Sequence, residues 1–217
     1  MKMTEDRRRA LDKNLVVGIV LVDFRKAFHS ISHSRLLQKL QGLGIAGDLW
    51  SWIKDYLSNR TQVTIINGSQ SNRRTVNFGV PQGSVLGPTL FALFCNDLPT
   101  IIDDRGGELH MYADDTTIYV AGPNPDIVAN VLNSVLRKLY HWCCHNSLTP
   151  HPGKTEYMLF QRGSFTGPLQ GIKLGDNYLS HVNSARYLGV KIDNMLKWNI
   201  HVKELCKCLS KKLNVLR

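Results

Sequence analysis

The sequence predicts an α+β fold in the ferredoxin-like split β-α-β-β-α-β order, with helices packed on an antiparallel sheet. Residues 15–22 form a nearly unbroken apolar run, which is typical of a buried central strand. Residues 109–120 contain two runs rich in β-branched and aromatic residues, which indicates a tight hairpin. Helical spacing of apolar residues at 86–96 and 126–146, and a strand at 156–161, complete the order. In that topology the first strand and the hairpin can be neighbours in one sheet.

The other elements lie before, between and after these five. In chain order we expect a polar helix at 4–14, helices at 34–41 and 47–58, strands at 62–68 and 73–78 around a turn at 67–72, a strand or hairpin at 185–193 and an amphipathic helix at 198–217. A glycine-rich segment at 163–171 indicates a subdomain boundary. We therefore divide the chain into residues 1–162 and 163–217.

Composition limits the class of protein. The 217 residues include 27 Lys and Arg against 17 Asp and Glu, a formal net charge of +10 that favours a polyanionic partner. No apolar run reaches the length of a membrane-spanning helix, and the basic start lacks the apolar segment of a signal peptide. Five cysteines without Cys-x-x-Cys spacing suit free thiols in a reducing compartment, so we expect an intracellular protein with no membrane partner.

Three carboxylates stand where strands are expected to end. Asp114 and Asp115 form the two-residue tip of the expected hairpin, and Asp23 directly follows the first strand. Adjacent carboxylates repel, and Asn-Gly or Asp-Gly would serve a purely structural hairpin better. A divalent cation would remove the repulsion, because Mg²⁺ takes carboxylate oxygens. If the strands are neighbours, the three carboxylates meet and can hold two Mg²⁺ ions; the alternative is a solvated acidic turn.

Two further segments are suited to contact a polyanion. The loop 79–88 is rich in glycine and proline, so a ligand can approach its backbone closely. Lys203, Lys207 and Lys211 share one face of the expected terminal helix. A solvated face is the default explanation for these lysines, and phosphate contact is the alternative.

Five motifs occur together in a characteristic order. They are Val22-Asp-Phe-Arg-Lys-Ala-Phe28, Gly79-Val-Pro-Gln-Gly-Ser-Val-Leu-Gly-Pro88, Tyr112-Ala-Asp-Asp115, Gly153-Lys-Thr155 and Tyr187-Leu-Gly-Val190. With them the chain resembles the reverse transcriptase of non-LTR retrotransposons of the LINE type, jockey-like elements in particular. It is similar to the palm of that polymerase over nearly its whole length, with partial fingers elements and the start of a thumb.

The resemblance implies an RNA-directed DNA polymerase, a nucleotidyltransferase that adds dNTPs to a primer 3′-OH by two-metal phosphoryl transfer. The implied cofactor is two Mg²⁺ ions, with Mn²⁺ as a substitute, and the implied partners are an RNA template, a DNA primer and dNTPs. A full-length element would also have an endonuclease and the rest of the fingers and thumb. It would act in a nuclear or cytoplasmic ribonucleoprotein.

The resemblance also implies roles for single residues. Asp23 and Asp114 would bind both metals, Asp115 would be a further ligand, and the Lys154 ammonium would neutralise or protonate the departing pyrophosphate. Phe28 would lie under the incoming sugar and exclude a 2′-hydroxyl, or else be an ordinary core residue. The remaining implied contacts are Phe24, Gln82, Gly83 and Tyr112 for nucleotide and template, and Tyr187, Leu188 and Gly189 for the primer grip.

The chain departs from the family pattern at two positions. His29 stands where family members usually have Asp, which removes a carboxylate that orders the loop, and His151 stands where they have Asn. One interpretation is therefore an active polymerase domain, and the other is an inactive truncated copy that only binds nucleic acid. A nucleotidyl cyclase or two-metal nuclease on the same topology is a weaker option, because neither needs the template-facing loop 79–88.

Overall fold

The computed structural model describes residues 5, 9–10, 12–81, 83–102, 107–162 and 170–215. In chain order its elements are β1 (Val16–Val22), α2 (Ala27–Ser30), α3 (His33–Gly42), α4 (Gly47–Leu57), β2 (Thr61–Gln62), β3 (Ile65–Ile66), β4 (Ser69–Gln70), β5 (Arg74–Thr75), α5 (Leu86–Phe94), the 3₁₀ helix η1 (Leu98–Ile101), β6 (Gly107–Tyr112), β7 (Asp115–Gly122), α6 (Pro125–Asn146), β8 (Glu156–Phe160), β9 (Lys173–Leu174), β10 (Asn177–Tyr178), β11 (Ser180–His181), β12 (Ser184–Tyr187), β13 (Val190–Asp193) and α7 (Asn199–Val215).

The chain folds as two compact units, and the long helix α6 contributes to both. The first unit comprises residues 1–23, 102–138 and 151–217, and the second comprises 24–101 and 139–150. The boundary that we predicted near residue 163 stays a prediction, because residues 163–169 lie outside the described part of the chain. Within the described part, no helix combines the length and the apolar character needed to cross a bilayer.

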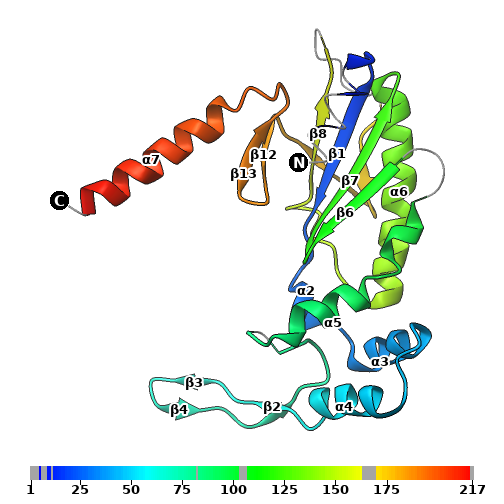
Figure 1. Ribbon diagram of the computed structural model, residues 1–217, viewed down its shortest axis with the longest axis vertical. Coiled ribbons are helices and arrows are strands. Elements are labelled where there is room, and N and C mark those ends of the chain that lie inside the picture. Colours follow the sequence, from blue (N-terminus) through cyan, green and yellow to red (C-terminus); the bar gives the residue numbers. More distant parts are fainter. Residues whose placement is uncertain are drawn as a thin grey trace. The chain divides into compact units, whose positions relative to one another are not determined.

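The first unit is built on a sheet with the strand order β11-β8-β1-β7-β6. Strand β1 pairs antiparallel with β7 on one side and with β8 on the other, and β6 and β7 form the predicted hairpin. Figure 1 shows these four strands side by side, with α6 running along them. The split β-α-β-β-α-β order and the pairing of the first strand with the hairpin are therefore confirmed. The short strand β11, which we did not predict, extends the sheet by pairing parallel to β8.

Successive side chains of β1 point to opposite faces of the sheet, and both faces are buried. Val17 and Ile19 face a hydrophobic cluster that also contains Met158 and Phe160 of β8. Gly18 faces α6 instead, and a Cβ built there would lie 2.5 Å from Val128 Cγ1 and 2.8 Å from Leu132 Cδ1. The missing side chain in β1 therefore lets α6 pack close to the sheet.

The cluster on the opposite face is covered by the hairpin of β12 and β13, which pair antiparallel. Ala185 and Ile192 supply its buried side chains. Asp193 then fixes the turn into α7: its Oδ1 accepts from the Met195 and Lys197 amides, and its Oδ2 accepts from the Trp198 amide at 3.1 Å. The hairpin predicted at 185–193 is thus confirmed, and this buried carboxylate anchors the chain that follows it.

Helix α7 is tied to the same hairpin by charge. Glu204 pairs with Lys191 at 2.8 Å and with Arg186 at 3.2 Å. The hydrogen bond from Lys191 is the main reason that the Glu204 pKa lies below its ordinary value. The polar face of α7 is exposed, as expected for Lys203, Lys207 and Lys211. The apolar side chains beside it are exposed too: Val202, Leu205, Leu209 and Leu213. The helix predicted over 198–217 is confirmed for residues 199–215, and residues 216–217 lie outside the described part.

The second unit packs α3 against α4 and α5. At its centre the Lys39 ammonium donates to the Phe94 carbonyl at 2.8 Å and pairs with Asp97 at 2.6 Å. The same ammonium lies 4.7 Å from the Phe94 ring centroid and 4.8 Å from that of Trp142, so the cation is held by aromatic faces as well. Burial raises the pKa of the nearby Cys95 thiol to about 12, which keeps it protonated at neutral pH.

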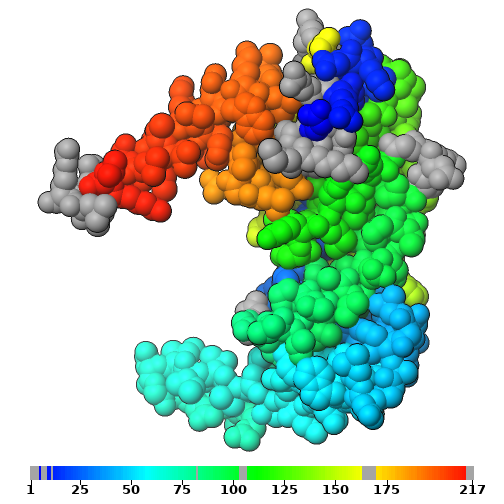
Figure 2. Space-filling view, viewed as in Figure 1, coloured from blue at the N-terminus to red at the C-terminus, as the bar shows by residue number. Residues whose placement is uncertain are grey.

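The hairpin that follows α4 differs from our prediction. Instead of two strands joined by a turn at 67–72, it consists of two short ladders, β2 with β5 and β3 with β4. Its turn is the pair Asn67-Gly68, with φ of 49° and 83°. Asn-Gly with two positive φ values is the sequence of a two-residue type I′ turn, so the longer predicted turn was wrong. Figure 2 shows this hairpin, in cyan to teal, projecting from α4.

Other elements are confirmed with small shifts. The helices predicted at 34–41, 47–58, 86–96 and 126–146 are present as α3, α4, α5 and α6, and the strand predicted at 156–161 is β8. The short helix α2 and strands β9 and β10 were not predicted. Of the helix predicted at 4–14, the structure describes residues 5, 9, 10 and 12 as helical, and the others through residue 11 lie outside the described part.

The close approach at Gly18 yields a stability prediction. Gly18→Ala is expected to lower the free energy of unfolding by about 1–3 kcal/mol, because the added methyl group must displace packed side chains of α6. Gly107→Ala in β6 is the matched control, since a Cβ there would meet its nearest atoms only at 3.6 Å. Urea unfolding followed by circular dichroism measures both variants. Equal losses in the two variants would contradict the packing argument.

Candidate active site

The register of the central sheet places the acidic residues. The last pair between β1 and β7 joins Val22 to Thr116, so the next position along the same register sets Asp23 opposite Asp115. Asp115 is also the first residue of β7 and pairs with Tyr112 at the end of β6. Asp23 and Asp115 therefore lie at neighbouring strand ends, as the sequence predicted from the split topology.

The turn between β6 and β7 is shifted by one residue from the predicted one. We expected Asp114 and Asp115 to form it, but its two residues are Ala113 and Asp114, and Asp115 belongs to the strand. The register between β6 and β7 pairs Tyr112 with Asp115 and so leaves only 113–114 for the connection. Ala113 takes a positive φ of 54° in this turn. A non-glycine residue in this conformation costs on the order of 1–3 kcal/mol, and such strain is concentrated at functional sites.

The carboxylates act on one another electrostatically. The Asp115 pKa is raised above its ordinary value, first by desolvation of the carboxyl group and then by repulsion from Asp114 and from Asp23. The Asp115 side chain is nevertheless largely exposed, so its desolvation is partial. Carboxylates that repel one another are a setting in which a hard divalent cation is stabilised.

The donor chemistry of these residues fits Mg²⁺, because three carboxylates lie on two neighbouring strand ends and the connecting turn. As the side chains stand, however, no three His, Cys, Asp or Glu residues of the described part are grouped closely enough to hold a metal ion. The structure thus brings Asp23, Asp114 and Asp115 to one edge of the sheet without forming the closed ligand set that we expected.

The backbone of Asp23 is held from a distant part of the chain. Its amide donates to Thr155 Oγ1 at 3.2 Å, and its carbonyl accepts from the His151 amide at 2.8 Å. Thr155 is almost fully buried, with 1% of its surface exposed. Sequence reasoning assigned a role only to Lys154 in the Gly153-Lys-Thr155 motif and missed the threonine. A buried hydroxyl needs a hydrogen-bonding partner, but the sequence does not show that the partner is Asp23, 132 positions away.

Lys154 and Tyr112 flank the acidic edge in the first unit. Lys154 is exposed in the turn that holds Asp23, and its amide donates to the His151 carbonyl at 3.0 Å. Tyr112 ends β6 with 69% of its surface exposed, although it pairs directly with Asp115. Both side chains are thus open to a ligand at this edge.

The expected primer grip forms the tip of the β12–β13 hairpin. Tyr187 pairs with Val190, and the two residues between them, Leu188 and Gly189, have φ of 47° and 81°. Two positive φ values again indicate a type I′ turn, which glycine accepts readily and leucine does not. Leu188 is 43% exposed, so a strained apolar side chain is presented at the tip.

The remaining predicted contacts belong to the second unit. Phe28 is half-buried and stacks on Phe91, with ring centroids 4.7 Å apart and an interplanar angle of 30°. Phe24 is buried, with 6% of its surface exposed, and forms a β-bridge with Pro150. Gly83 is exposed with φ of 73°, a conformation that favours glycine. Gln82 lies outside the described residues.

Comparison with known families decides the identity of the fold. A family model described as reverse transcriptase (RNA-dependent DNA polymerase) matches residues 1–192. The chain belongs to this family. The family resemblance predicted from the five motifs is therefore confirmed.

Two curated relatives of this reverse transcriptase chain come from Drosophila melanogaster retroelements. A probable RNA-directed DNA polymerase from transposon BS is 29% identical over 221 residues, covering 100% of this chain and 24% of that protein. The RNA-directed DNA polymerase from mobile element jockey is 28% identical over 207 residues, covering 93% of this chain and 22% of that protein. The chain thus spans about a quarter of the length of these relatives.

Solved structures support the fold. Apo telomerase from Candida tropicalis, truncated from its C-terminal domain, superposes with a TM-score of 0.62 at 15% identity. The match covers 91% of this reverse transcriptase chain and 38% of the telomerase chain. The predicted α+β, palm-like fold is consistent with that neighbour.

The coupling among the carboxylates can be measured directly. Asp114→Asn and Asp23→Asn are each expected to lower the Asp115 pKa, because each removes a negative charge that disfavours ionisation of Asp115. Carboxyl ¹³C chemical shifts followed through a pH titration report the change. Asp12→Asn is the control, since Asp12 pairs with Arg162 ahead of β1. If the pKa of Asp115 were unchanged in both test variants, the electrostatic coupling among the carboxylates would be refuted.

The hydrogen bonds that hold the backbone of Asp23 give a second prediction. Thr155→Val is expected to lower the free energy of unfolding by about 1 kcal/mol, since the half-buried Asp23 amide loses its acceptor. Hydrogen exchange at that amide should become faster. Thr155→Ser keeps the hydroxyl group and should exchange nearly as slowly as the wild type. Slow exchange in the valine variant would show that another group holds Asp23.

Proposed function

We propose that this chain is the catalytic core of an RNA-directed DNA polymerase, which extends a DNA primer with dNTPs along an RNA template. The observation that carries the proposal is the register that places Asp23 opposite Asp115, with Asp114 in the adjoining turn. Membership of the reverse transcriptase family supports the same activity. In the reaction the primer 3′-oxygen forms a bond to the α-phosphorus, the 3′-OH proton is lost, and pyrophosphate leaves.

Asp23, Asp114 and Asp115 are the residues that would hold two Mg²⁺ ions, or Mn²⁺ in their place. When bound, these ions supply charge neutralisation and favour ionisation of the attacking hydroxyl. The contribution of the chain is to fix the ligands. Thr155 and the His151 amide orient the backbone of Asp23, and pairing with β6 orients Asp115.

The other residues position the reactants in this proposal. Lys154 places an ammonium on the segment that holds Asp23, where it would neutralise or protonate the departing pyrophosphate. Phe28 has one ring face packed on Phe91, which fixes the ring as a wall against a 2′-hydroxyl. Gly83 and Gln82 would line the nascent base pair, and Tyr112 with Phe24 would border the nucleotide.

The primer would be held by the β12–β13 tip in this proposal. Tyr187, Leu188 and Gly189 present a turn whose backbone conformation is set by two positive φ values. The net charge of +10 suits an RNA template and a DNA primer, because a nucleic-acid backbone is recognised largely through its phosphates. The fingers and thumb segments of a longer element would complete the grip on primer and template, and such an element would also carry an endonuclease.

A second candidate function is nucleic-acid binding without catalysis. The observation in its favour is that the side chains of the described residues form no ready-made group of three metal ligands. The substitution of His29 for the usual Asp points in the same direction, since it removes a carboxylate beside Phe28. Under this alternative the basic chain would still bind RNA in a salt-dependent manner.

Primer extension separates the two functions. With a homopolymer RNA template and a DNA primer, the wild-type chain is expected to incorporate the complementary dNTP when Mg²⁺ is present and to stop when it is chelated. Asp114→Asn should reduce incorporation by at least about a hundredfold, because a charged metal ligand is lost. Asp12→Asn, the same substitution away from the site, should retain activity. Absence of incorporation by the wild type, together with salt-sensitive binding, would support the second function.

A further inference from the structure

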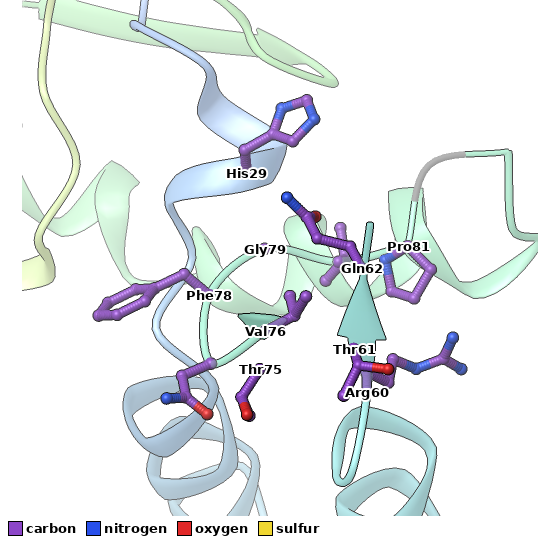
Figure 3. Close-up of a pocket in the computed structure, with 11 residues that line it drawn as sticks. His29, Arg60, Thr61, Gln62, Thr75, Val76, Phe78, Gly79 and Pro81 are labelled. Atoms are coloured by element: carbon purple, nitrogen blue, oxygen red, sulfur yellow. The ribbon is translucent and has the colours of Figure 1, made fainter. Parts of the chain in front are cut away.

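A cleft of about 690 Å³ lies in the second unit, between the foot of the β2–β5 hairpin and the segment that leads from β5 toward the loop 79–88. Its volume falls in the range of known ligand sites. The residues that define its chemistry are His29, Arg60, Gln62, Thr75, Asn77 and Phe78. In Figure 3 the Gln62 amide is directed toward His29, and the Phe78 ring lies to their left. His29 was noted from the sequence only as a departure from the family pattern, and the other five residues were assigned no role.

The floor of the cleft is held firmly. The Gly79 amide donates to the Ile31 carbonyl at 2.7 Å, and the Val80 amide donates to the Phe28 carbonyl at 2.8 Å. Gly79 has φ of 85°, and a Cβ there would lie 2.8 Å from His29 Cα. Only glycine fits this close approach, so the floor is pinned to the segment that carries Phe28 and His29. The cleft is therefore part of the packed structure of the second unit.

The charge around the cleft has one sign. Residues 56–96 contain no Asp, Glu or Lys, and their charges are Arg60, Arg73 and Arg74. Arg60 lines the cleft: its Nε donates to the Tyr56 carbonyl at 2.6 Å, and its guanidinium lies 4.6 Å from the centroid of the Tyr56 ring. These contacts orient the guanidinium, whose terminal nitrogens can donate to a phosphate oxygen. A polyanion would thus meet no opposing carboxylate on this stretch of chain.

The neutral lining suits bases better than phosphates. Gln62 and Asn77 each offer both a donor and an acceptor, which is what the edge of an unpaired base requires. Phe78 is an aromatic residue with 56% of its surface exposed, and the exposed His29 adds a second ring. Exposed aromatic rings beside a cationic groove are the usual means of holding single-stranded nucleic acid.

We propose that this cleft binds a segment of single-stranded RNA. Arg60 contacts a backbone phosphate, Phe78 stacks on a base, and Gln62 with Asn77 bonds the edge of a base. A nucleoside triphosphate fits less well, because its several negative charges would face one permanent cation in the lining. A duplex also fits less well, because its base edges are already paired. The proposal rests on the proposed function only in naming RNA as the strand.

Binding of a short, unstructured, fluorescein-labelled RNA, measured by fluorescence anisotropy in EDTA without dNTPs, tests the cleft apart from catalysis. Phe78→Leu and Arg60→Gln are each expected to weaken binding about tenfold, through loss of one stacked base and of one phosphate contact. Arg60→Gln should also reduce the slope of log K against log salt by about 0.7. Asn77→Ala is a third variant. It removes the amide group that bonds the edge of a base, leaves the backbone contacts unchanged, and should also weaken binding.

Matched controls separate the cleft from general charge. Arg73→Gln makes the same charge change on the same hairpin outside the cleft, and Ile65→Ala removes an exposed apolar side chain near the tip. Both should bind RNA like the wild type. Equal losses in Arg60→Gln and Arg73→Gln would overturn the proposal in favour of diffuse charge, and so would full binding by Phe78→Leu and Asn77→Ala.

Competition identifies the ligand class. Unlabelled single-stranded RNA should displace the probe, whereas single-stranded DNA, an RNA–DNA duplex and dNTPs should displace it more weakly. Equal or better displacement by any of these would overturn the assignment to single-stranded RNA. A wild-type chain that shows the expected pattern but incorporates no dNTP would overturn the polymerase proposal and leave the cleft in place.

Discussion

The pairing of β1 on both of its edges is the constraint on which the first unit depends. Seven residues of β1 pair with β7 and five pair with β8. Because successive side chains of β1 point to opposite faces of the sheet, this one strand contributes side chains to both buried faces. A slip by one residue would turn Gly18 away from α6 and move Val17 and Ile19 out of their cluster. The same register determines where Asp23 emerges relative to Asp115. The position of the acidic edge is thus a consequence of core packing.

The acidic edge combines several features that do not favour stability. Desolvation, and then repulsion from Asp114 and Asp23, raise the Asp115 pKa, and Ala113 takes a left-handed backbone conformation in the adjoining turn. The Asp23 amide donates to Thr155 Oγ1 and the Asp23 carbonyl accepts from the His151 amide, so the backbone beside this strained turn is held in place. Chemical sites commonly carry such strain where the surrounding structure is rigid enough to maintain it.

Recognition of nucleic acid and phosphoryl transfer place different demands on a chain. Phosphoryl transfer needs closely spaced carboxylates, which repel a nucleic-acid backbone unless cations are bound. Strand recognition needs cations, rings and amide groups without acidic neighbours, which is the character of residues 56–96. In this reverse transcriptase chain the acidic edge belongs to the first unit and the cleft beside Arg60 belongs to the second.

The sequence alone determined the split strand and helix order, the antiparallel neighbours of β1 and the family, because these follow from apolar periodicity and from motifs that are contiguous in the chain. It did not determine the position of the β6–β7 turn, which depends on the register between these two strands. The Asn67-Gly68 turn was overlooked although its signal is local. The Thr155 hydroxyl and the cleft could not be found in this way. Asp23 and Thr155 are 132 positions apart, and the cleft joins His29 to residues 60–81. Contacts between such distant segments exist only after the chain has packed, so the tertiary structure alone decides which polar groups meet.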